Sequence, residues 1–239
     1  MHPSIENKVA VVTGASRGIG YRIAERLLEE GAKVMICSSQ QRHVEQAVET
    51  LRKKSGKCIE GITADVRHYP QVERLMAACE EAFGGIDILV NNAGIGIFRS
   101  VERMSPEEWD AVIGTNLSGA FYCVRAAVPR LKRRGGGYIF NISSLAGKNA
   151  FAGGAAYNAS KFGLNGFSEA MMLDLRYENI RTSYIMPGSV ATDFSASSGQ
   201  SSWKSSADDV AQVVIDLLQS DPRSMLSRVE IRPSKPPRK

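Results

Sequence analysis

Hydrophobic and polar residues alternate along this chain in two kinds of segment. Residues 8–13 form a short, continuous run of β-branched and apolar positions, which is typical of a strand covered on both faces. The next segment repeats apolar residues at helical spacing, with Ile19, Ile23 and Leu27 on one face and Gly31 as a stop signal. The start of the chain therefore predicts a strand followed by an amphipathic helix.

The same alternation continues to the end of the chain. Apolar runs predict strands at residues 8–13, 33–38, 58–63, 86–91, 137–142, 181–186 and 228–232. Helical periodicity predicts helices at residues 19–30, 41–55, 70–83, 105–133, 156–177 and 207–219. The helix at 105 has a clear start, because Ser105 can cap it, Pro106 suits its first position and Glu108 can close a capping box. The pattern predicts an α/β fold, a doubly wound parallel sheet of about seven strands with helices on both faces.

The length of 239 residues allows either one large domain or two small ones. No linker rich in Pro, Gly or Ser interrupts the chain before residue 195, so we predict a single domain over residues 1–239. The Ser-rich residues 195–206 are expected to be mobile, and residues 233–239 are expected to form a frayed tail.

Composition excludes several classes of protein. The chain is 43% hydrophobic and 23% charged, which is typical of a soluble globular protein rather than a disordered or fibrous one. It has no run of 18 apolar residues, so no membrane partner is expected. The first predicted strand begins within eight residues of Met1, which leaves no room for a signal peptide, and we expect a cytoplasmic protein.

The mild basic excess and the cysteines add little chemistry. The formal charge is +5. The clusters of basic residues at 52–54 and 132–134 lie where helix C-termini are predicted, and the helix dipole favours cations there. Aromatic and basic residues do not interleave, so we expect no nucleic-acid partner. No metal site is predicted, because no His or second Cys lies at ligand spacing. We expect reduced, mostly buried thiols at Cys37, Cys58, Cys79 and Cys123.

A glycine loop follows the first predicted strand, Thr13-Gly14-Ala15-Ser16-Arg17-Gly18-Ile19-Gly20. Glycines at such a turn allow a tight bend, let backbone N–H groups approach a pyrophosphate and let the helix pack closely on the strand. The helix N-terminus then faces the phosphate charge. The loop predicts a dinucleotide site with candidate contacts at Gly14, Ser16, Arg17, Gly18, Ile19 and Gly20.

The end of the second predicted strand indicates which dinucleotide binds. An acidic residue there would hold the ribose 2′-hydroxyl and repel a 2′-phosphate, but residues 36–42 contain none. Ser38 and Ser39 can donate hydrogen bonds to a phosphate, and Arg17 and Arg42 can supply charge. We therefore favour NADP(H) over NAD. The alternative is that Arg17 is a solvated loop residue and Arg42 points away.

Further candidate residues follow other predicted strands, at the edge where a doubly wound sheet binds its ligand. Asp65 and Val66 follow the third strand. Asn92, Ala93 and Gly94 follow the fourth, and their small side chains allow the backbone to approach a ribose or nicotinamide.

Tyr157 comes thirteen residues after Ser144, and Lys161 follows it by four, so the two lie one turn apart on a predicted helix. An ammonium beside a phenol stabilises the phenolate and lowers a pKa that starts near 10. We therefore predict a lowered pKa for Tyr157, which would make it a usable acid or base near neutral pH.

In this order the motifs resemble those of the short-chain dehydrogenase/reductase family over nearly the whole chain. The matching elements are residues 13–20, Asp65, residues 91–94, Asn116, Ser144, Tyr157, Lys161 and residues 187–192. The resemblance implies a Rossmann fold and hydride transfer between a nicotinamide and a carbonyl carbon, with the protein supplying orientation and the proton.

The resemblance also implies roles for individual residues. Tyr157 is the proton donor, Ser144 orients the substrate oxygen, and Lys161 lowers the pKa of Tyr157 and holds the nicotinamide ribose. Asn116 is expected to hold a water that relays protons to Lys161. Asp65 and Val66 contact the adenine. The remaining cofactor contacts implied are Pro187, Gly188, Val190 and Thr192.

Among the family's members the chain is most similar to 3-oxoacyl-acyl-carrier-protein reductases and NADP-dependent carbonyl reductases. This implies NADPH-dependent reduction of a ketone or 3-oxoacyl thioester. Two departures stand out: Ser39 takes a place where NADP-using relatives often have Arg, and the C-terminus lacks the glycine-rich ending of the acyl-carrier-protein reductases. The alternatives are an NAD-dependent alcohol dehydrogenase and a non-catalytic regulator that senses a dinucleotide.

Relatives commonly pair as dimers or tetramers through two long helices, here 105–133 and 156–177, and we expect a homotetramer. The candidate face comprises Phe121, Val124, Val128, Ala155, Phe162, Gly166, Ala170 and Leu173, with burial against the sheet as the alternative. The substrate pocket is expected to be shaped by Ile95, Phe98, Leu145, Phe151 and residues 193–206. These residues suggest an apolar carbonyl compound without selecting one.

Overall fold

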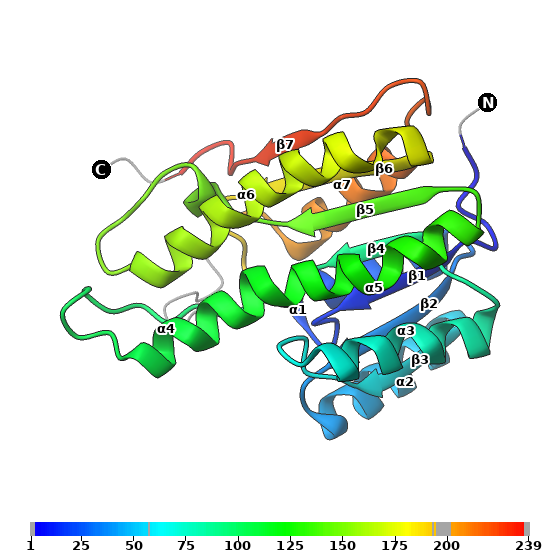
Figure 1. The fold of residues 1–239 in the computed structure, drawn as a ribbon, viewed down its shortest axis with the longest axis horizontal. Coiled ribbons are helices and arrows are strands. Elements are labelled where there is room, and N and C mark those ends of the chain that lie inside the picture. Colours follow the sequence, from blue (N-terminus) through cyan, green and yellow to red (C-terminus); the bar gives the residue numbers. More distant parts are fainter. Residues whose placement is uncertain (1–2, 57, 193, 195–201, 237–239) are drawn as a thin grey trace.

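Seven parallel strands form one sheet in the order β3-β2-β1-β4-β5-β6-β7 (Figure 1). The structure, a computed structural model, describes residues 3–56, 58–192, 194 and 202–236. The strands are β1 (Val9–Thr13), β2 (Lys33–Ser38), β3 (Ile59–Thr63), β4 (Ile88–Asn91), β5 (Gly137–Ile142), β6 (Ile180–Pro187) and β7 (Arg228–Ile231). The predicted parallel α/β sheet is thus confirmed.

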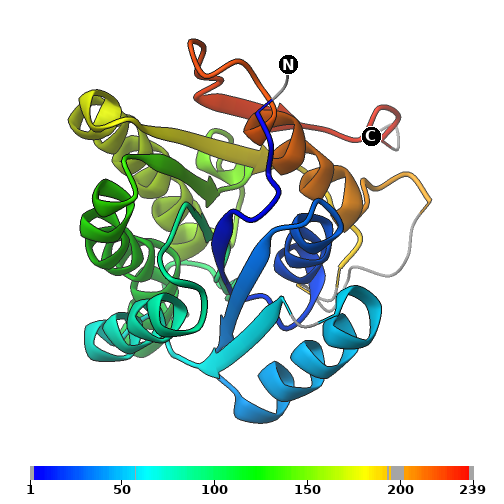
Figure 2. The same cartoon turned by 90° about the vertical axis from the view of Figure 1, so that its right-hand side faces the viewer.

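Helices cover both faces of this sheet, as Figure 2 shows. One face carries α1 (Gly18–Glu29), α2 (Gln41–Ser55) and α7 (Ala207–Leu218). The other carries α3 (Tyr69–Phe83), α5 (Gly119–Arg133) and α6 (Ala155–Leu175). All of β1 is buried: Ala10 and Val12 join the first core, whereas Val9 and Val11 join the second. This two-sided burial explains why the strands appear in the sequence as continuous apolar runs.

The sheet reverses its strand order between β1 and β4. From β1 the chain moves outward to β2 and β3, then crosses back to pair β4 with the other side of β1. The loops at the carboxyl ends of β1 and β4 therefore turn in opposite directions and leave a crevice between them. Open α/β sheets bind their ligands at this point.

The predicted helix at 105–133 is interrupted. Its start is confirmed, since Ser105 accepts a hydrogen bond from the Glu108 N–H at 3.2 Å and caps α4 (Pro106–Ile113). A π-helical turn, η1 (Gly114–Ser118), then separates α4 from α5. The wider turn carries the buried Asn116, and such turns are frequent at functional sites.

The stretch Pro106–Arg133 is also the one helix among the described residues that is long and apolar enough to cross a membrane by length and composition. A helix that covers a parallel sheet has the same composition. In this fold Cys123, Ala127 and Leu131 are buried in the core beside the sheet.

The proposed oligomer face is corrected in part. Val124 lies on the side of α5 that is buried in the core, and Val128 packs against that core, because one side of α5 must cover the sheet. Phe121, Phe162 and Leu173 are exposed on α5 and α6. The homotetramer stays a prediction.

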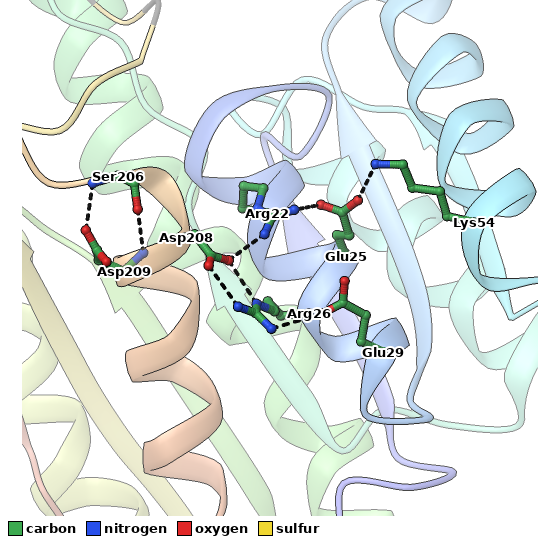
Figure 3. A network of polar contacts seen from close by, with 8 residues as sticks. All are labelled: Arg22, Glu25, Arg26, Glu29, Lys54, Ser206, Asp208 and Asp209. Carbon is green, nitrogen blue, oxygen red and sulfur yellow. Dashed lines mark hydrogen bonds and ion pairs between the residues drawn. The ribbon is translucent and has the colours of Figure 1, made fainter. Parts of the chain in front are cut away.

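A charged network joins α1 to α7 (Figure 3). Asp208, in the first turn of α7, accepts hydrogen bonds from Arg22 at 2.6 Å and from two nitrogens of Arg26 at 2.8 Å. Arg22 also pairs with the buried Glu25, which Lys54 reaches from α2 at 2.6 Å. The network fixes the helix that follows the glycine loop to the helix that follows residues 193–206.

We expect Asp208→Asn to lower the melting temperature by roughly 3–6 °C, which corresponds to about 1–2 kcal/mol for a partly exposed network. Thermal unfolding followed by circular dichroism measures this. The two arginines hold the pKa of Asp208 at about 2, below its usual 3.8. The stabilisation is therefore present above about pH 4 and is lost as the pH falls through 2. Asp216→Asn is the control, since among the described residues Asp216 bonds only Gln212, on the same helix, and an equal loss there would contradict the prediction.

Candidate active site

A cavity of about 1180 Å³ lies at the carboxyl edge of the sheet. This exceeds the roughly 300–1,000 Å³ of common small-molecule sites, so it has room for a dinucleotide and a substrate. The predicted site residues that line it are Gly14, Ser16, Arg17, Gly18, Ile19, Ser38, Ser39, Asp65, Val66, Asn92, Ala93, Gly94, Ser144, Tyr157, Lys161, Pro187, Gly188, Val190 and Thr192. Three predicted residues, Gly20, Arg42 and Asn116, do not line it.

The glycine loop has the shape of an anion cradle. Gly14 has a φ of +62°, and a Cβ there would lie 2.7 Å from the Ala93 Cα, so both conformation and space require glycine. No side chain caps the N-terminus of α1 and no acidic residue lies in its first turn. A helix start of this kind suits a phosphate group. Gly20 serves packing instead, because a Cβ there would meet the Gly14 carbonyl at 2.7 Å.

The loop after β4 is tied to the glycine loop by hydrogen bonds. Thr13 Oγ1 accepts from the N–H groups of Asn92 and Ala93, both at 3.1 Å. The side-chain amide of Asn92 donates to the Thr13 carbonyl at 2.9 Å and to the Gly14 carbonyl at 3.0 Å. Thr13 and Asn92 therefore hold the two sides of the crevice at a fixed separation.

The end of β2 corrects one prediction. Ser38 and Ser39 line the cavity, but Arg42 is exposed and does not. Gln40 and His43 line it instead. The helix α2 begins at Gln41, so neighbouring residues of its first turn point about 100° apart, and His43 takes the place expected of Arg42.

Arg67 is a cavity residue that sequence reasoning missed. Its guanidinium holds both carboxylate oxygens of Asp65, with Nη2–Oδ2 at 2.6 Å and Nε–Oδ1 at 3.1 Å. The hydrogen bonds from Arg67 hold the pKa of Asp65 below its usual value. Asp65 is thus fixed as a carboxylate beside Val66, and the two-residue spacing from Asp65 to Arg67 was the available signal.

Tyr157 and Ser144 line the cavity together, with the Ser144 hydroxyl near enough to the phenol to affect its pKa. The ring of Tyr157 lies between Phe98 and Phe194, at centroid distances of 5.6 and 5.8 Å. Burial raises the pKa of Tyr157 above its usual 10, and the Ser144 hydroxyl opposes this. The predicted lowering of the Tyr157 pKa by the side chains of the protein is therefore wrong, because the loss of hydration around the phenol has the larger effect.

Lys161 is buried one turn from Tyr157. Its side-chain nitrogen donates to the Ile142 carbonyl at 2.9 Å and lies 5.8 Å from the centroid of the Tyr157 ring. Burial lowers the pKa of Lys161 to about 8. Ser143 donates to Asn165 at 2.5 Å and is buried, whereas Ser144 is the serine whose hydroxyl affects the pKa of Tyr157.

Asn116 is buried behind the cavity. Its amide nitrogen donates to the Ile95 carbonyl at 2.9 Å and to Ser160 Oγ at 3.0 Å, and its oxygen accepts from the Ile95 N–H at 2.8 Å. A Cβ on Gly94 would lie 3.4 Å from the Asn116 oxygen and 3.8 Å from the Lys161 nitrogen. Asn116 thus joins η1, α6 and the loop after β4, and its expected water relay stays a prediction.

The substrate end of the cavity is lined by Ile95, Phe98, Leu145 and Phe151, as predicted. Of the Ser-rich segment, residues 195–201 lie outside the described residues. Trp203 and Lys204 line the cavity, and Ser205 bridges to Val190.

The predicted frayed tail also takes part in the cavity. Pro233 and Pro236 of this tail line it, next to Arg232 at the end of the predicted last strand, so the chain after β7 contacts the site. Residues 237–239 lie outside the described residues.

Comparisons with known proteins agree with this geometry. A family model described as short chain dehydrogenase matches residues 8–203. A 3α-hydroxysteroid dehydrogenase from Mediterraneibacter gnavus is 37% identical over 197 residues, which cover 82% of this chain and 79% of that protein. A putative ketoacyl reductase from Streptomyces coelicolor is 38% identical over 194 residues, covering 80% and 74%.

A solved structure extends the similarity to the whole fold. A metagenomic short-chain oxidoreductase in complex with NADP has a TM-score of 0.85 and 37% identity, and the match covers 98% of this chain and all of that one. The family match, the sheet order and the Ser144, Tyr157 and Lys161 arrangement agree. The chain therefore belongs to the short-chain dehydrogenase/reductase family.

Proposed function

We propose that this protein is an NADPH-dependent reductase that converts a ketone or 3-oxoacyl thioester to the alcohol. The observation that carries the proposal is that Ser144, Tyr157 and the buried Lys161 line one cavity together with the glycine loop. NADPH, when bound, supplies the hydride to the carbonyl carbon. The proton that completes the alcohol comes from the protein.

The side chains divide this work. Tyr157 keeps its proton at neutral pH, because burial raises its pKa, and its O–H can donate to the carbonyl oxygen. Ser144, which lines the cavity with Tyr157, orients that oxygen. The ammonium of Lys161 is charged below its pKa of about 8 and stabilises the phenolate that remains after donation. Phe98 and Phe194 pack around the Tyr157 ring and exclude water.

NADP(H) is the proposed dinucleotide. No carboxylate lines the cavity at the end of β2 among the described residues, where it would repel a 2′-phosphate, and Ser38, Ser39 and Arg17 can bind one. The similar metagenomic short-chain oxidoreductase was solved in complex with NADP, which supports the same choice.

Replacing Arg17 tests this choice. We expect Arg17→Gln to weaken NADPH binding about tenfold and to leave NADH binding within about twofold, since a lost charge–phosphate contact is worth about 1.4 kcal/mol. Fluorescence titration of the two reduced dinucleotides measures both constants. Arg42→Gln is the matched control, because Arg42 is close in sequence but does not line the cavity. Equal losses for both dinucleotides, or a larger loss in the Arg42 variant, would contradict the proposal.

The reaction itself is tested by NADPH oxidation with β-ketoacyl thioesters, diketones, aldehydes and quinones. Turnover of ketones or thioesters with NADPH supports the proposal. Faster oxidation of alcohols with NAD would favour the alternative dehydrogenase. Binding of NADPH without turnover of any compound would favour a regulator.

A further inference from the structure

The cavity is strongly biased toward positive charge. Among the described residues that line it, Asp65 is the only carboxylate. The lining cations are Arg17, Arg67, Lys161, Lys204 and Arg232. A concave surface of one charge sign raises the local concentration of oppositely charged ligands. The excess therefore points to anionic ligands.

Three of these cations already have a function in the site. Arg17 binds the 2′-phosphate of the dinucleotide under the proposed function. Arg67 is paired with Asp65, and Lys161 lies beside Tyr157. Lys204 and Arg232 have no part in hydride transfer, in proton donation or in the glycine loop.

Arg232 lines the cavity near Leu145, one of the predicted substrate-pocket residues. The Gly188 N–H donates to the Ile231 carbonyl at 2.8 Å, which fixes the end of β7 beside Gly188. A Cβ on Gly188 would lie 3.0 Å from the Leu145 Cδ1 and 3.4 Å from the Pro233 Cδ. Arg232 is thus next to the loop that carries Ser144. Figure 1 shows this C-terminal stretch beside the loop that follows β5.

Neighbouring carboxylates do not neutralise the positive charge of Arg232 and Lys204. Glu230 is shared by three cations, with Arg232 at 2.7 Å, Lys148 at 2.9 Å and Arg228 at 3.0 Å. One carboxylate against three cations leaves a surplus of two positive charges. Lys204 lies over the Trp203 ring at 5.9 Å and pairs with no carboxylate among the described residues. Half of the Arg232 side chain remains exposed.

These two residues are also outside the part of the chain that the family model matches, which ends at residue 203. Lys204 and Arg232 therefore lie beyond the family match, although the similar solved structure covers 98% of this chain.

We propose that Arg232, aided by Lys204, binds an anionic group of the substrate, so that the preferred substrates are carbonyl compounds with a carboxylate or phosphate away from the reacting carbon. The inference rests on the proposed reductase function. It adds a charge requirement to a pocket whose other walls, at Phe98, Leu145 and Phe151, are apolar.

Matched substrate pairs test the proposal. We expect kcat/KM with NADPH to be at least about tenfold higher for 5-oxohexanoate or 7-oxooctanoate than for the methyl ester of each. This preference for the anion should fall with added salt. A second pair, acetoacetyl-coenzyme A and acetoacetyl-N-acetylcysteamine, distinguishes a phosphate from a carboxylate as the bound anion. Arg232→Gln should reduce kcat/KM for the anionic member about tenfold and leave the neutral member within about twofold.

Arg228→Gln is the control, since Arg228 pairs with the same Glu230 but does not line the cavity, and it should leave the preference intact. The absence of a preference in the unmodified protein, equal losses for both members in Arg232→Gln, or weakened NADPH binding in that variant would each overturn the inference. The same pairs are also titrated against the NADPH complex by fluorescence. Anion-selective binding that Arg232→Gln removes, without any turnover, would support the anion site and refute the reductase.

Discussion

Tyr157→Phe is expected to lower kcat for carbonyl reduction by about 10²–10⁴-fold, the usual range for loss of a general acid. The substitution removes only the phenolic O–H. The ring that packs between Phe98 and Phe194 stays, so NADPH should bind with nearly unchanged affinity. Single-turnover measurement of NADPH oxidation isolates the chemical step, and fluorescence titration reports binding. Tyr122→Phe, which changes a half-buried tyrosine outside the cavity, should have no effect on kcat.

The pH dependence adds an independent test of this role. Because burial raises the pKa of Tyr157, the phenol remains protonated through neutral pH, and the rate of reduction should be flat until Lys161 begins to lose its charge near pH 8. Alcohol oxidation requires the phenolate and should rise with pH over the same range. A Tyr157→Phe variant that retained a tenth or more of the activity would contradict the assignment. A variant that lost turnover but kept every cellular effect of the protein would favour the regulator.

The fold was predictable because each strand is buried on both faces and each helix has one apolar side. Those patterns predicted all seven strands, and the capping residues predicted the helix start at Ser105. The break in the helix at Gly114 was not predictable, since a π turn adds one residue without changing the apolar composition around it. Val124 and Phe121 look alike in sequence, and only the rotation of α5 on the sheet decides that the first is buried and the second exposed.

The site was predictable where backbone chemistry or one helical turn fixes the residue. Gly14 needs a positive φ, and Tyr157 and Lys161 share one helix face. Prediction was wrong where the start of a helix or a distant segment decides. The exact start of α2 decides that His43, and not Arg42, lines the cavity. Arg232 lines the cavity because β7 pairs with β6. The direction of the Tyr157 pKa depends on burial by Phe98 and Phe194, which lie far from it in sequence.

Lys161→Met is expected to produce opposite effects on activity and stability. Activity should fall about 10²-fold or more, because the ammonium that stabilises the phenolate is lost. Stability should rise at neutral pH, because the chain no longer buries a charge. The pKa of Lys161 is about 8 in the folded protein, against 10.5 for a solvated lysine, so the folded state disfavours the charged form. A difference of this size corresponds to about 3 kcal/mol, from which the loss of the hydrogen bond to Ile142 subtracts about 1 kcal/mol.

The sign of the pH dependence separates this cause from general repacking. Between pH 8 and 10.5 the unfolded chain binds more protons at Lys161 than the folded chain does, so the stability of the unmodified protein rises with pH in that window. Its disadvantage against the methionine variant is therefore full below pH 8 and disappears by about pH 10.5. Alkaline groups that do not interact with Lys161 titrate equally in both proteins and cancel in the difference. Lys148→Met, at an exposed lysine paired with Glu230, should give no such gain. Our interpretation is that the buried charge of Lys161 serves catalysis and lowers the stability of the fold. A Lys161→Met protein that is less stable than the parent at pH 7, or a stability difference that does not depend on pH, would contradict it.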